Sequence, residues 1–360
     1  MDMSKAFDMV EWSELFLTLM ERKVEPVFLR LILYIYQNQM CDVKWCGKFS
    51  HRFPVSNGVR QGGVSSGIFF AVYIDKLLTI LRASGLGCHI NMVFLGAMVF
   101  ADDIILLSAS RGGLQSMVNL CQDFVHQRNL KFGTHPDPVK SKTKCIIFSK
   151  RIRAGQQPAN IRLNGNILPW VDRVKHLGHT LQSDNSMKID MAQKRGAFIG
   201  KVNSLLQEFH FVSPEVFMKL LNTYATSMYG SNTWDILSSD CERLYKSFNV
   251  TVRNVFNLDR CTHRYLVEPL AGSLHLKVML ESRYVTFFNS LVKSKKMPVR
   301  FLARISQNDL RTVLGRTLYS LKTRCGLAPD QTSQLTANLV KKKLNYFATP
   351  ETEAWRIEMS

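Results

Sequence analysis

The sequence predicts an α+β protein in which a first part of mixed helices and short strands precedes a basic second part that is almost entirely helical. Hydrophobic spacing switches between the helical and the strand period over the first 150 residues, whereas helical spacing dominates after residue 186. Charge divides the chain in the same way, with a net charge of +5 over residues 1–150 and +14 over residues 151–360. A hydrophobic content of 46% excludes a chain that is disordered throughout.

The first part alternates helical and extended segments. Helices are predicted where apolar residues recur at helical spacing: Met9–Arg22, Glu25–Gln37, Ser66–Leu81 and Gly112–Gln127. Strands are predicted in one hairpin of Asp42–Cys46 and Phe49–Val55 around Gly47-Lys48, in a second of Asn91–Phe100 and Ile104–Ser108 around Ala-Asp-Asp, and in Thr143–Phe148.

A polar segment, Arg151–Pro158, breaks this pattern and marks a predicted boundary. A short hairpin of Ile161–Leu163 and Ile167–Trp170 follows, with Asn164-Gly165-Asn166 as its turn signal. Beyond residue 178 the predicted helices are Ser186–Glu208, Pro214–Tyr229, Asp240–Phe256, Leu274–Lys293 and a weaker set after residue 300.

The charge predicts a polyanionic partner. The chain carries a net charge of +19, and +12 of it falls within residues 251–350. Solvated helix faces account for single lysines but not for a concentration of this size. Nucleic acid is therefore the expected partner, and an anionic membrane surface is the alternative.

Neither a signal peptide nor a transmembrane segment is predicted. The first eight residues are charged where a signal peptide needs an apolar run. The 19-residue uncharged stretch Ala83–Ala101 contains glycines and is interpreted as a turn followed by a buried strand. Eight scattered cysteines lack the spacing of a zinc site. We expect a reduced intracellular protein with buried thiols, in the cytoplasm, the nucleus or both.

Two adjacent carboxylates, Asp102 and Asp103, are predicted at the tip of an apolar hairpin. Their mutual repulsion favours a divalent cation as neutraliser, but for an isolated Asp-Asp pair a plain polar turn is the favoured explanation. Two further segments favour a functional site: Met1–Asp8, which supplies an acidic residue at the end of a predicted strand before a helix, and the glycine-rich turn Asn57–Gly63 before a core helix.

Together these segments resemble the palm motifs of a reverse transcriptase. The motifs occur in order as Asp2-x-x-x-x-Phe7-Asp8, Gly58-Val59-Arg60-Gln61-Gly62, Phe100-Ala101-Asp102-Asp103, Lys142-Thr143 and His176-Leu177-Gly178. Ser-Lys-Ala-Phe-Asp, Phe-Ala-Asp-Asp and Tyr229-Gly230 are most similar to LINE-type (non-LTR) retrotransposons, with jockey-like elements as the suggested subgroup. A group II intron maturase shares the Ala-Asp-Asp box but fits the first motif less well. The resemblance covers residues 1–180 and extends more loosely to residue 300.

The resemblance implies a role for each matching residue. Asp2, Asp102 and Asp103 would be the catalytic metal ligands and hold two Mg²⁺ ions, or Mn²⁺, for nucleotide transfer to a primer 3′-hydroxyl. Roles in nucleotide and template binding fall on residues that line the pocket: Phe7, which would exclude a 2′-hydroxyl, then Gln61, Gly62 and Lys142, with Lys140 as the alternative to Lys142. His176, Leu177 and Gly178 would form the primer grip. The implied partners are an RNA template, a DNA primer and deoxynucleoside triphosphates.

The implied architecture is a palm, an antiparallel sheet backed by helices, followed by an all-α basic thumb and C-terminal region. We assign residues 1–150 to the palm, 151–180 to a connection with the primer-grip hairpin, 181–300 to the thumb and 301–360 to a basic helical region. The first motif begins at residue 2, so the fingers and the endonuclease of such elements are expected to be missing. Gly67 also stands where the family has proline.

Two functions remain open at this point. The first is an RNA-directed DNA polymerase domain that is incomplete or inactive as this chain. The second is a catalytically dead, retroelement-derived protein that still binds RNA or DNA. The intact aspartates favour the first and the missing fingers favour the second. The sequence leaves the oligomeric state open.

Overall fold

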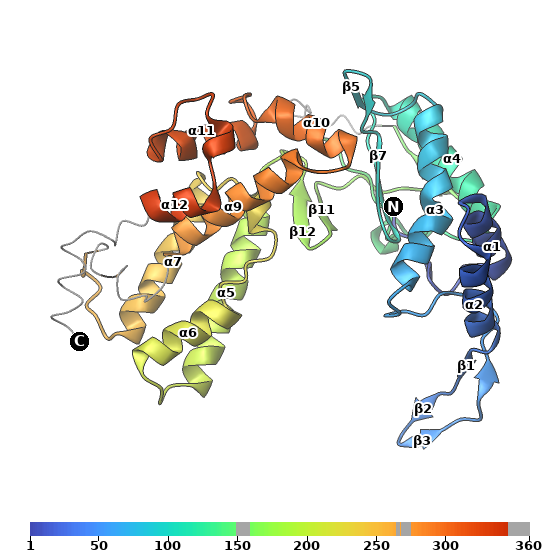
Figure 1. The fold of residues 1–360 in the computed structure, drawn as a ribbon, viewed down its shortest axis with the longest axis horizontal. Coiled ribbons are helices and arrows are strands. Elements are labelled where there is room, and N and C mark those ends of the chain that lie inside the picture. The colour runs from blue at the N-terminus through green and yellow to red at the C-terminus, as the bar shows by residue number, and fades with distance from the viewer. Residues whose placement is uncertain (149–158, 264–266, 268–274, 345–360) are drawn as a thin grey trace. The chain divides into compact units, whose positions relative to one another are not determined.

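The computed structural model describes residues 1–148, 159–263, 267 and 275–344. The chain forms two compact units, Met1–Val171 and Asp172–Ser360 (Figure 1). The predicted boundary Arg151–Pro158 lies outside the described residues. The ranges assigned to palm, connection and thumb stay predictions.

The first unit is organised around four helices: α1 (Trp12–Glu21), α2 (Pro26–Gln37), α3 (Ser66–Ala83) and α4 (Arg111–His126). Helix α3 is the centre of the core because its apolar residues lie on most of its faces, and Phe70, Tyr73 and Leu77 are fully buried. Helix α4 begins after Ser110, whose hydroxyl accepts a hydrogen bond from the amide of Gly113. These helices match the four predicted ones.

The strands of this unit are short and pair in antiparallel hairpins: β1 (Met40–Cys41) with β4 (Phe53–Pro54), β2 (Lys44–Trp45) with β3 (Lys48–Phe49), β5 (His89–Ile90) with β6 (Val93–Phe94), β7 (Ala97–Phe100) with β8 (Asp103–Leu106), and β9 (Arg162–Leu163) with β10 (Asn166–Ile167). The 3₁₀ turn η1 (Pro138–Lys140) also belongs to this unit. The predicted mixture of helices and antiparallel strands is therefore confirmed.

Several predicted details of the strands are wrong, and two of them have a clear physical reason. The first hairpin turns at Cys46-Gly47 rather than Gly47-Lys48, with φ of +46° and +80°, because a two-residue turn of this hand prefers glycine second. The predicted strand Thr143–Phe148 is reduced to one parallel bridge, between Cys145 and Trp170. Its neighbour Pro169 has no amide proton to extend the pairing.

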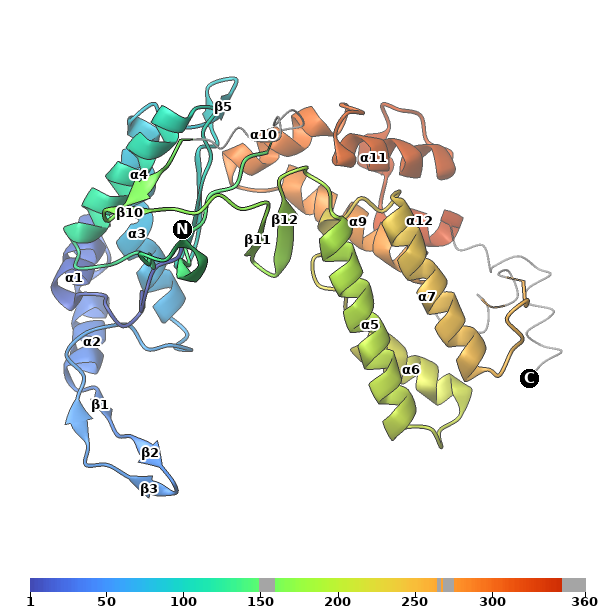
Figure 2. The ribbon, with the colours of Figure 1, turned by 180° about the vertical axis from the view of Figure 1, so that it is seen from behind.

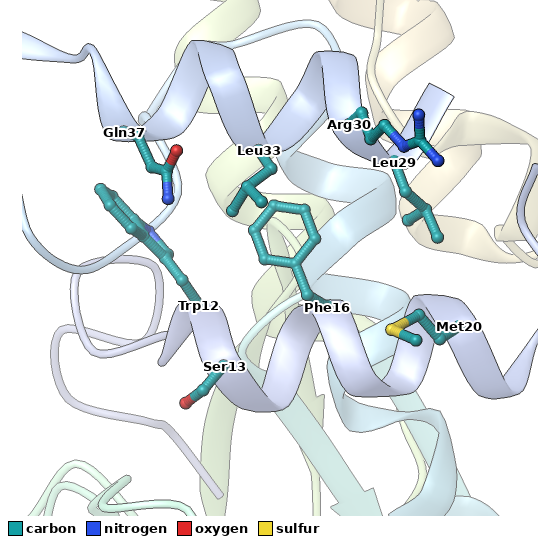
Figure 3. Close-up of a pocket in the computed structure, with 8 residues that line it drawn as sticks. All are labelled: Trp12, Ser13, Phe16, Met20, Leu29, Arg30, Leu33 and Gln37. Atoms are coloured by element: carbon teal, nitrogen blue, oxygen red, sulfur yellow. The ribbon is translucent and has the colours of Figure 1, made fainter. Parts of the chain in front are cut away.

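An apolar groove of about 400 Å³ separates α1 from α2 (Figure 3). Its lining is mainly apolar and comes from the two helices, with three polar side chains among the eight: Trp12, Ser13, Phe16, Met20, Leu29, Arg30, Leu33 and Gln37. None of the predicted site residues lines it.

Where the structure describes it, the second unit is helical apart from one hairpin, β11 (Arg173–His176) with β12 (His179–Gln182). Its helices are α5 (Lys188–Glu208), α6 (Pro214–Tyr224), α7 (Ser239–Val255), α9 (Leu276–Val292), α10 (Met297–Ser306), α11 (Val313–Arg324) and α12 (Ala337–Leu344), with 3₁₀ turns η2 (Ser231–Thr233) and η3 (Thr332–Gln334). Helices α5 and α7 lie side by side (Figure 2). Trp234, Tyr245 and Phe288 are buried at the centre of the unit.

No helix in the described ranges is both long and apolar enough to cross a membrane. The uncharged stretch Ala83–Ala101 instead contains the last residue of α3, the hairpin β5–β6 and all of β7.

The cysteines are only partly buried, which corrects the expectation of buried thiols. Cys41, Cys46 and Cys261 are exposed. Burial raises the pKa of Cys121 and of Cys241 to about 12, so neither thiol ionises appreciably at pH 8.

This difference predicts selective alkylation. Iodoacetamide at pH 8 should modify Cys41, Cys46 and Cys261 in the native protein, because their thiols are exposed. Cys121 and Cys241 should react only after denaturation, because a thiol with a raised pKa offers little thiolate to the reagent. Peptide mass spectrometry before and after denaturation measures both groups. Rapid native labelling of Cys121 would contradict the buried environment.

Candidate active site

The segment Met1–Ser4 lies between β8 and the chain after α4. On one side Asp2 forms an antiparallel bridge with Asp103. On the other side Met3 is bridged to Phe132, and the Gly133 amide donates to the Asp2 carbonyl at 2.8 Å. Three stretches distant in sequence are therefore held together by backbone hydrogen bonds.

This arrangement brings two of the three predicted carboxylates together. Residues directly opposite each other in an antiparallel bridge direct their side chains to the same face, so Asp2 and Asp103 are neighbours. Asp103 is the first residue of β8 and pairs with Phe100, so the turn is only Ala101-Asp102 rather than the predicted three residues. Asp102 lies at the tip of this hairpin, after Ala101 with a φ of +51°. Positive φ at a residue other than glycine costs free energy and is concentrated at functional sites.

Asp2 has an unsatisfied oxygen. Its Oδ2 is shielded from solvent and has no hydrogen-bond partner in the part of the chain that the structure describes. The nearest cation is Lys142, whose Nζ lies 3.8 Å from that oxygen and whose side chain is exposed. Lys140, the alternative in the sequence, ends the turn η1. The structure thus associates Lys142 rather than Lys140 with Asp2.

The carboxylates fit a hard divalent cation. A buried carboxylate oxygen without a partner is costly, and oxygen ligands of this kind are those that Mg²⁺ prefers. Over the described ranges, no group of three or more acidic, histidine or cysteine side chains is close enough to hold a metal ion by itself. Mg²⁺ commonly takes only one or two carboxylates and completes its coordination with water and substrate phosphates.

The glycine-rich turn lies against the chain that follows the first motif. The Gly58 amide donates to the Val10 carbonyl and the Val59 amide to the Phe7 carbonyl, each at 2.8 Å. A Cβ at Gly58 would lie 2.9 Å from the Asp8 carbonyl oxygen, so only glycine fits this approach. The structure thereby places the predicted turn next to Phe7.

The residues predicted to line the nucleotide pocket, Phe7, Gln61 and Gly62, differ in their surroundings. Phe7 is half-buried and stacks on Phe70 of α3, with ring centroids 4.8 Å apart. Gln61 is exposed, and its Nε2 donates to Oδ1 of Asp8 at 3.4 Å. Gly62 is exposed, and a Cβ there would meet nothing within 4 Å. Phe7 is thus fixed from one side by the core, while Gln61 and Gly62 face solvent.

The predicted primer grip forms the turn of the β11–β12 hairpin in the second unit. His176 pairs with His179, and the turn residues Leu177 and Gly178 have φ of +45° and +78°. Lys194 of α5 donates from Nζ to the Gly178 carbonyl at 2.8 Å.

A set of residues that sequence reasoning did not assign a role supports this hairpin. Buried Asp190 contacts His179 at 3.2 Å and accepts a hydrogen bond from the Thr180 amide at 2.9 Å. Tyr229 stacks on the His179 ring at 5.9 Å. A Cβ at Gly230 would lie 2.0 Å from that ring, which explains the glycine. Tyr229-Gly230 was noticed only as a mark of the family, and its spacing from the hairpin gives no sign of contact.

Comparison with known proteins identifies the family. Residues 1–181 match the family model described as reverse transcriptase (RNA-dependent DNA polymerase). The chain therefore belongs to the reverse transcriptase family, as its motif order predicts.

The relatives are polyproteins of non-LTR retrotransposons, which confirms the predicted LINE-type resemblance. The chain is 30% identical over 204 residues to the retrovirus-related Pol polyprotein of the type-2 retrotransposable element R2DM of Drosophila melanogaster, covering 54% of this chain and 18% of the relative. It is 28% identical over 194 residues to the R2 polyprotein of Nasonia vitripennis (52% and 18%) and 27% identical over 270 residues to the R1 polyprotein of Bradysia coprophila (69% and 25%). The chain thus spans a quarter or less of the length of these relatives.

Proposed function

We propose that this chain carries the polymerase centre of an RNA-directed DNA polymerase, with the first unit as the palm and the second as the thumb and basic C-terminal region. The observation that supports it best is the backbone bridge between Asp2 and Asp103, which brings together carboxylates from the first and third family motifs. The shielded Oδ2 of Asp2 supports the same assignment, because among the described residues it has no hydrogen-bond partner and only the Lys142 ammonium 3.8 Å away, which leaves it available to a cation.

In this proposal Asp2, Asp102 and Asp103 hold divalent cations. When bound, such ions neutralise charge on the triphosphate and lower the pKa of the primer hydroxyl. The primer 3′-oxygen bonds to the α-phosphorus, the bond between the α- and β-phosphates breaks, and pyrophosphate leaves. The proton of the primer hydroxyl passes to solvent.

Lys142 is proposed to act on the leaving group. Its exposed ammonium is 3.8 Å from Asp2 Oδ2, so it is held at the edge of the carboxylate pair while its stem remains free to reorient. From there it can neutralise charge on pyrophosphate or donate a proton to it. Phe7, fixed by its stack on Phe70, is proposed to exclude a ribose 2′-hydroxyl, and Gln61 with Gly62 to line the nucleotide pocket.

Lys142 and Lys140 provide a matched pair of substitutions. Lys142→Gln is expected to slow nucleotide addition by about 10²-fold or more, which is the scale on which a positioned proton donor contributes. Lys140→Gln removes the same charge two residues away and should change the rate little. Single-turnover addition of one nucleotide to a bound primer measures both. Equal effects of the two variants would reduce the role of Lys142 to general electrostatics.

The proposed activity is tested by primer extension. With an RNA template, a DNA primer, Mg²⁺ or Mn²⁺ and deoxynucleoside triphosphates, the chain should add the nucleotides that the template specifies and stop where one is withheld. Binding to template and primer should weaken steeply with salt, because the net +12 of residues 251–350 acts mainly on phosphates. Steep salt-dependent binding without synthesis would favour the alternative, a catalytically dead RNA- or DNA-binding protein.

A further inference from the structure

The β-ribbon formed by residues 40–54 extends from the end of α2 (Figure 1). Every residue from Met40 to Pro54 is exposed, so the ribbon contributes nothing to a core. It nevertheless carries three aromatic side chains, and Trp45 and Phe49 are 78% and 64% exposed. Aromatic rings left in water at no structural benefit are typical of a binding surface.

Cations alternate with these rings in a regular way. The two paired positions of β2 and β3 are Lys44 opposite Phe49 and Trp45 opposite Lys48. Since residues directly opposite each other share a face, each face of the ribbon presents one aromatic ring and one ammonium group. On one face the contact is direct, with Lys44 Nζ 5.4 Å from the centroid of the Phe49 ring.

The charges of the ribbon also favour an anion. Beside Lys44 and Lys48 the ribbon carries Arg52, and its single acidic residue is Asp42, which lies 3.7 Å from Arg52. Asp42 is thus paired with Arg52, and among the described residues neither Lys44 nor Lys48 forms an ion pair with a carboxylate. A protein partner that buried these rings would also have to desolvate two ammonium groups.

We propose that this ribbon binds single-stranded nucleic acid. A base would stack on Trp45 or Phe49, and the phosphate beside it would contact Lys48 or Lys44. Rings that accept any base, flanked by cations that follow the backbone, are the elements that proteins use to bind single strands without sequence preference. This site is separate from the carboxylates, so the inference does not depend on polymerase activity and is tested without synthesis.

The test measures binding of a twelve-nucleotide single-stranded oligonucleotide, as RNA and as DNA, and of an abasic oligomer of equal length and charge. Trp45→Ala should weaken binding of the oligonucleotides by about 5-fold to 100-fold, as removal of a stacking ring does. It should leave the abasic oligomer unchanged, because that oligomer contacts only the cations. Tyr34→Ala is the matched control, since Tyr34 on α2 is 66% exposed and lies outside the ribbon.

Two further measurements locate the effect. Cys46 at the ribbon turn is exposed, so bound oligonucleotide should slow its alkylation. Cys261 of the other unit is also exposed, and its alkylation rate is the internal control for the activity of the reagent. Trp45→Phe should restore binding, and Lys44→Gln with Lys48→Gln should reduce the slope of affinity against salt. Thermal unfolding should be unchanged in every variant because these residues are exposed.

Three results would overturn the inference. The first is equal affinity of the wild-type protein and Trp45→Ala for the oligonucleotides. The second is alkylation of Cys46 at the same rate with and without bound oligonucleotide. The third is a change in self-association, measured by sedimentation, that accompanies Trp45→Ala without any change in affinity, since it would make the ribbon a protein contact.

Discussion

Asp102→Asn is expected to slow RNA-templated primer extension by about 10²–10³-fold or more. Removal of one group that stabilises developing charge slows an enzyme on this scale, and an amide replaces the carboxylate without its charge. Asparagine has nearly the same shape as aspartate and tolerates turn conformations, so the two-residue turn Ala101-Asp102 should keep its structure. The rate is measured by single-turnover nucleotide addition at saturating template and primer.

Asp123→Asn is the control for this substitution. Asp123 is an exposed residue of α4 and plays no part in the carboxylate pair, so the same change of charge there should leave the rate unaltered. Affinity for template and primer should also be unchanged in Asp102→Asn, since residues 251–350 are proposed to provide most of it. Synthesis by Asp102→Asn at the wild-type rate would place the chemistry elsewhere.

The individual elements could be predicted because local spacing determines them. Ser66–Leu81 is apolar on most faces and becomes the central helix α3. Asn164-Gly165 is a strong turn signal and joins β9 to β10. In both cases the signal lies within a few residues of the structure that it determines.

One prediction that failed, the end of α6, depends on a distant partner. The helix predicted over Pro214–Tyr229 ends at Tyr224, because the Arg283 guanidinium of α9 donates to the carbonyls of Thr226 and Ser227. A helix continued to Tyr229 would instead pair the Thr226 carbonyl with the Gly230 amide. Nothing within the segment itself shows that an arginine more than fifty residues later captures these carbonyls.

In the candidate site, too, the residues could be predicted from the sequence but their contacts could not. Motif order named Asp2, Asp102, Asp103 and Lys142, but neither the bridge from Asp2 to Asp103 nor the 3.8 Å approach of Lys142 to Asp2 follows from local spacing. These contacts join residues more than 100 positions apart, and they arise from how the hairpin β7–β8 and the chain after α4 pack around Met1–Ser4. Composition likewise indicated a nucleic-acid partner, while the alternation of rings and cations on the β2–β3 ribbon needed the strand register.

Arg324→Met is expected to lower the free energy of unfolding of the second unit by about 3–5 kcal/mol. Glu281 of α9 is 1% exposed, and its carboxylate accepts hydrogen bonds from both terminal nitrogens of Arg324 at 2.5 and 3.2 Å. Removing the arginine leaves a buried carboxylate without its main cation, which is the costly way to break such a pair. Hydrogen exchange of peptides from α9 and α11 reports this unit selectively.

Two further variants test whether the loss of stability comes from the buried charge of Glu281. Arg316→Met breaks the more exposed pair with Asp235, 3.1 Å apart, and should cost only about 0–1 kcal/mol because water screens it. The double variant Glu281→Leu with Arg324→Met should recover most of the stability lost in Arg324→Met, since apolar side chains can replace a buried pair at little cost. A double variant as unstable as Arg324→Met alone would contradict this explanation. The lost stability would then come from lost packing of the arginine stem and not from the buried charge of Glu281.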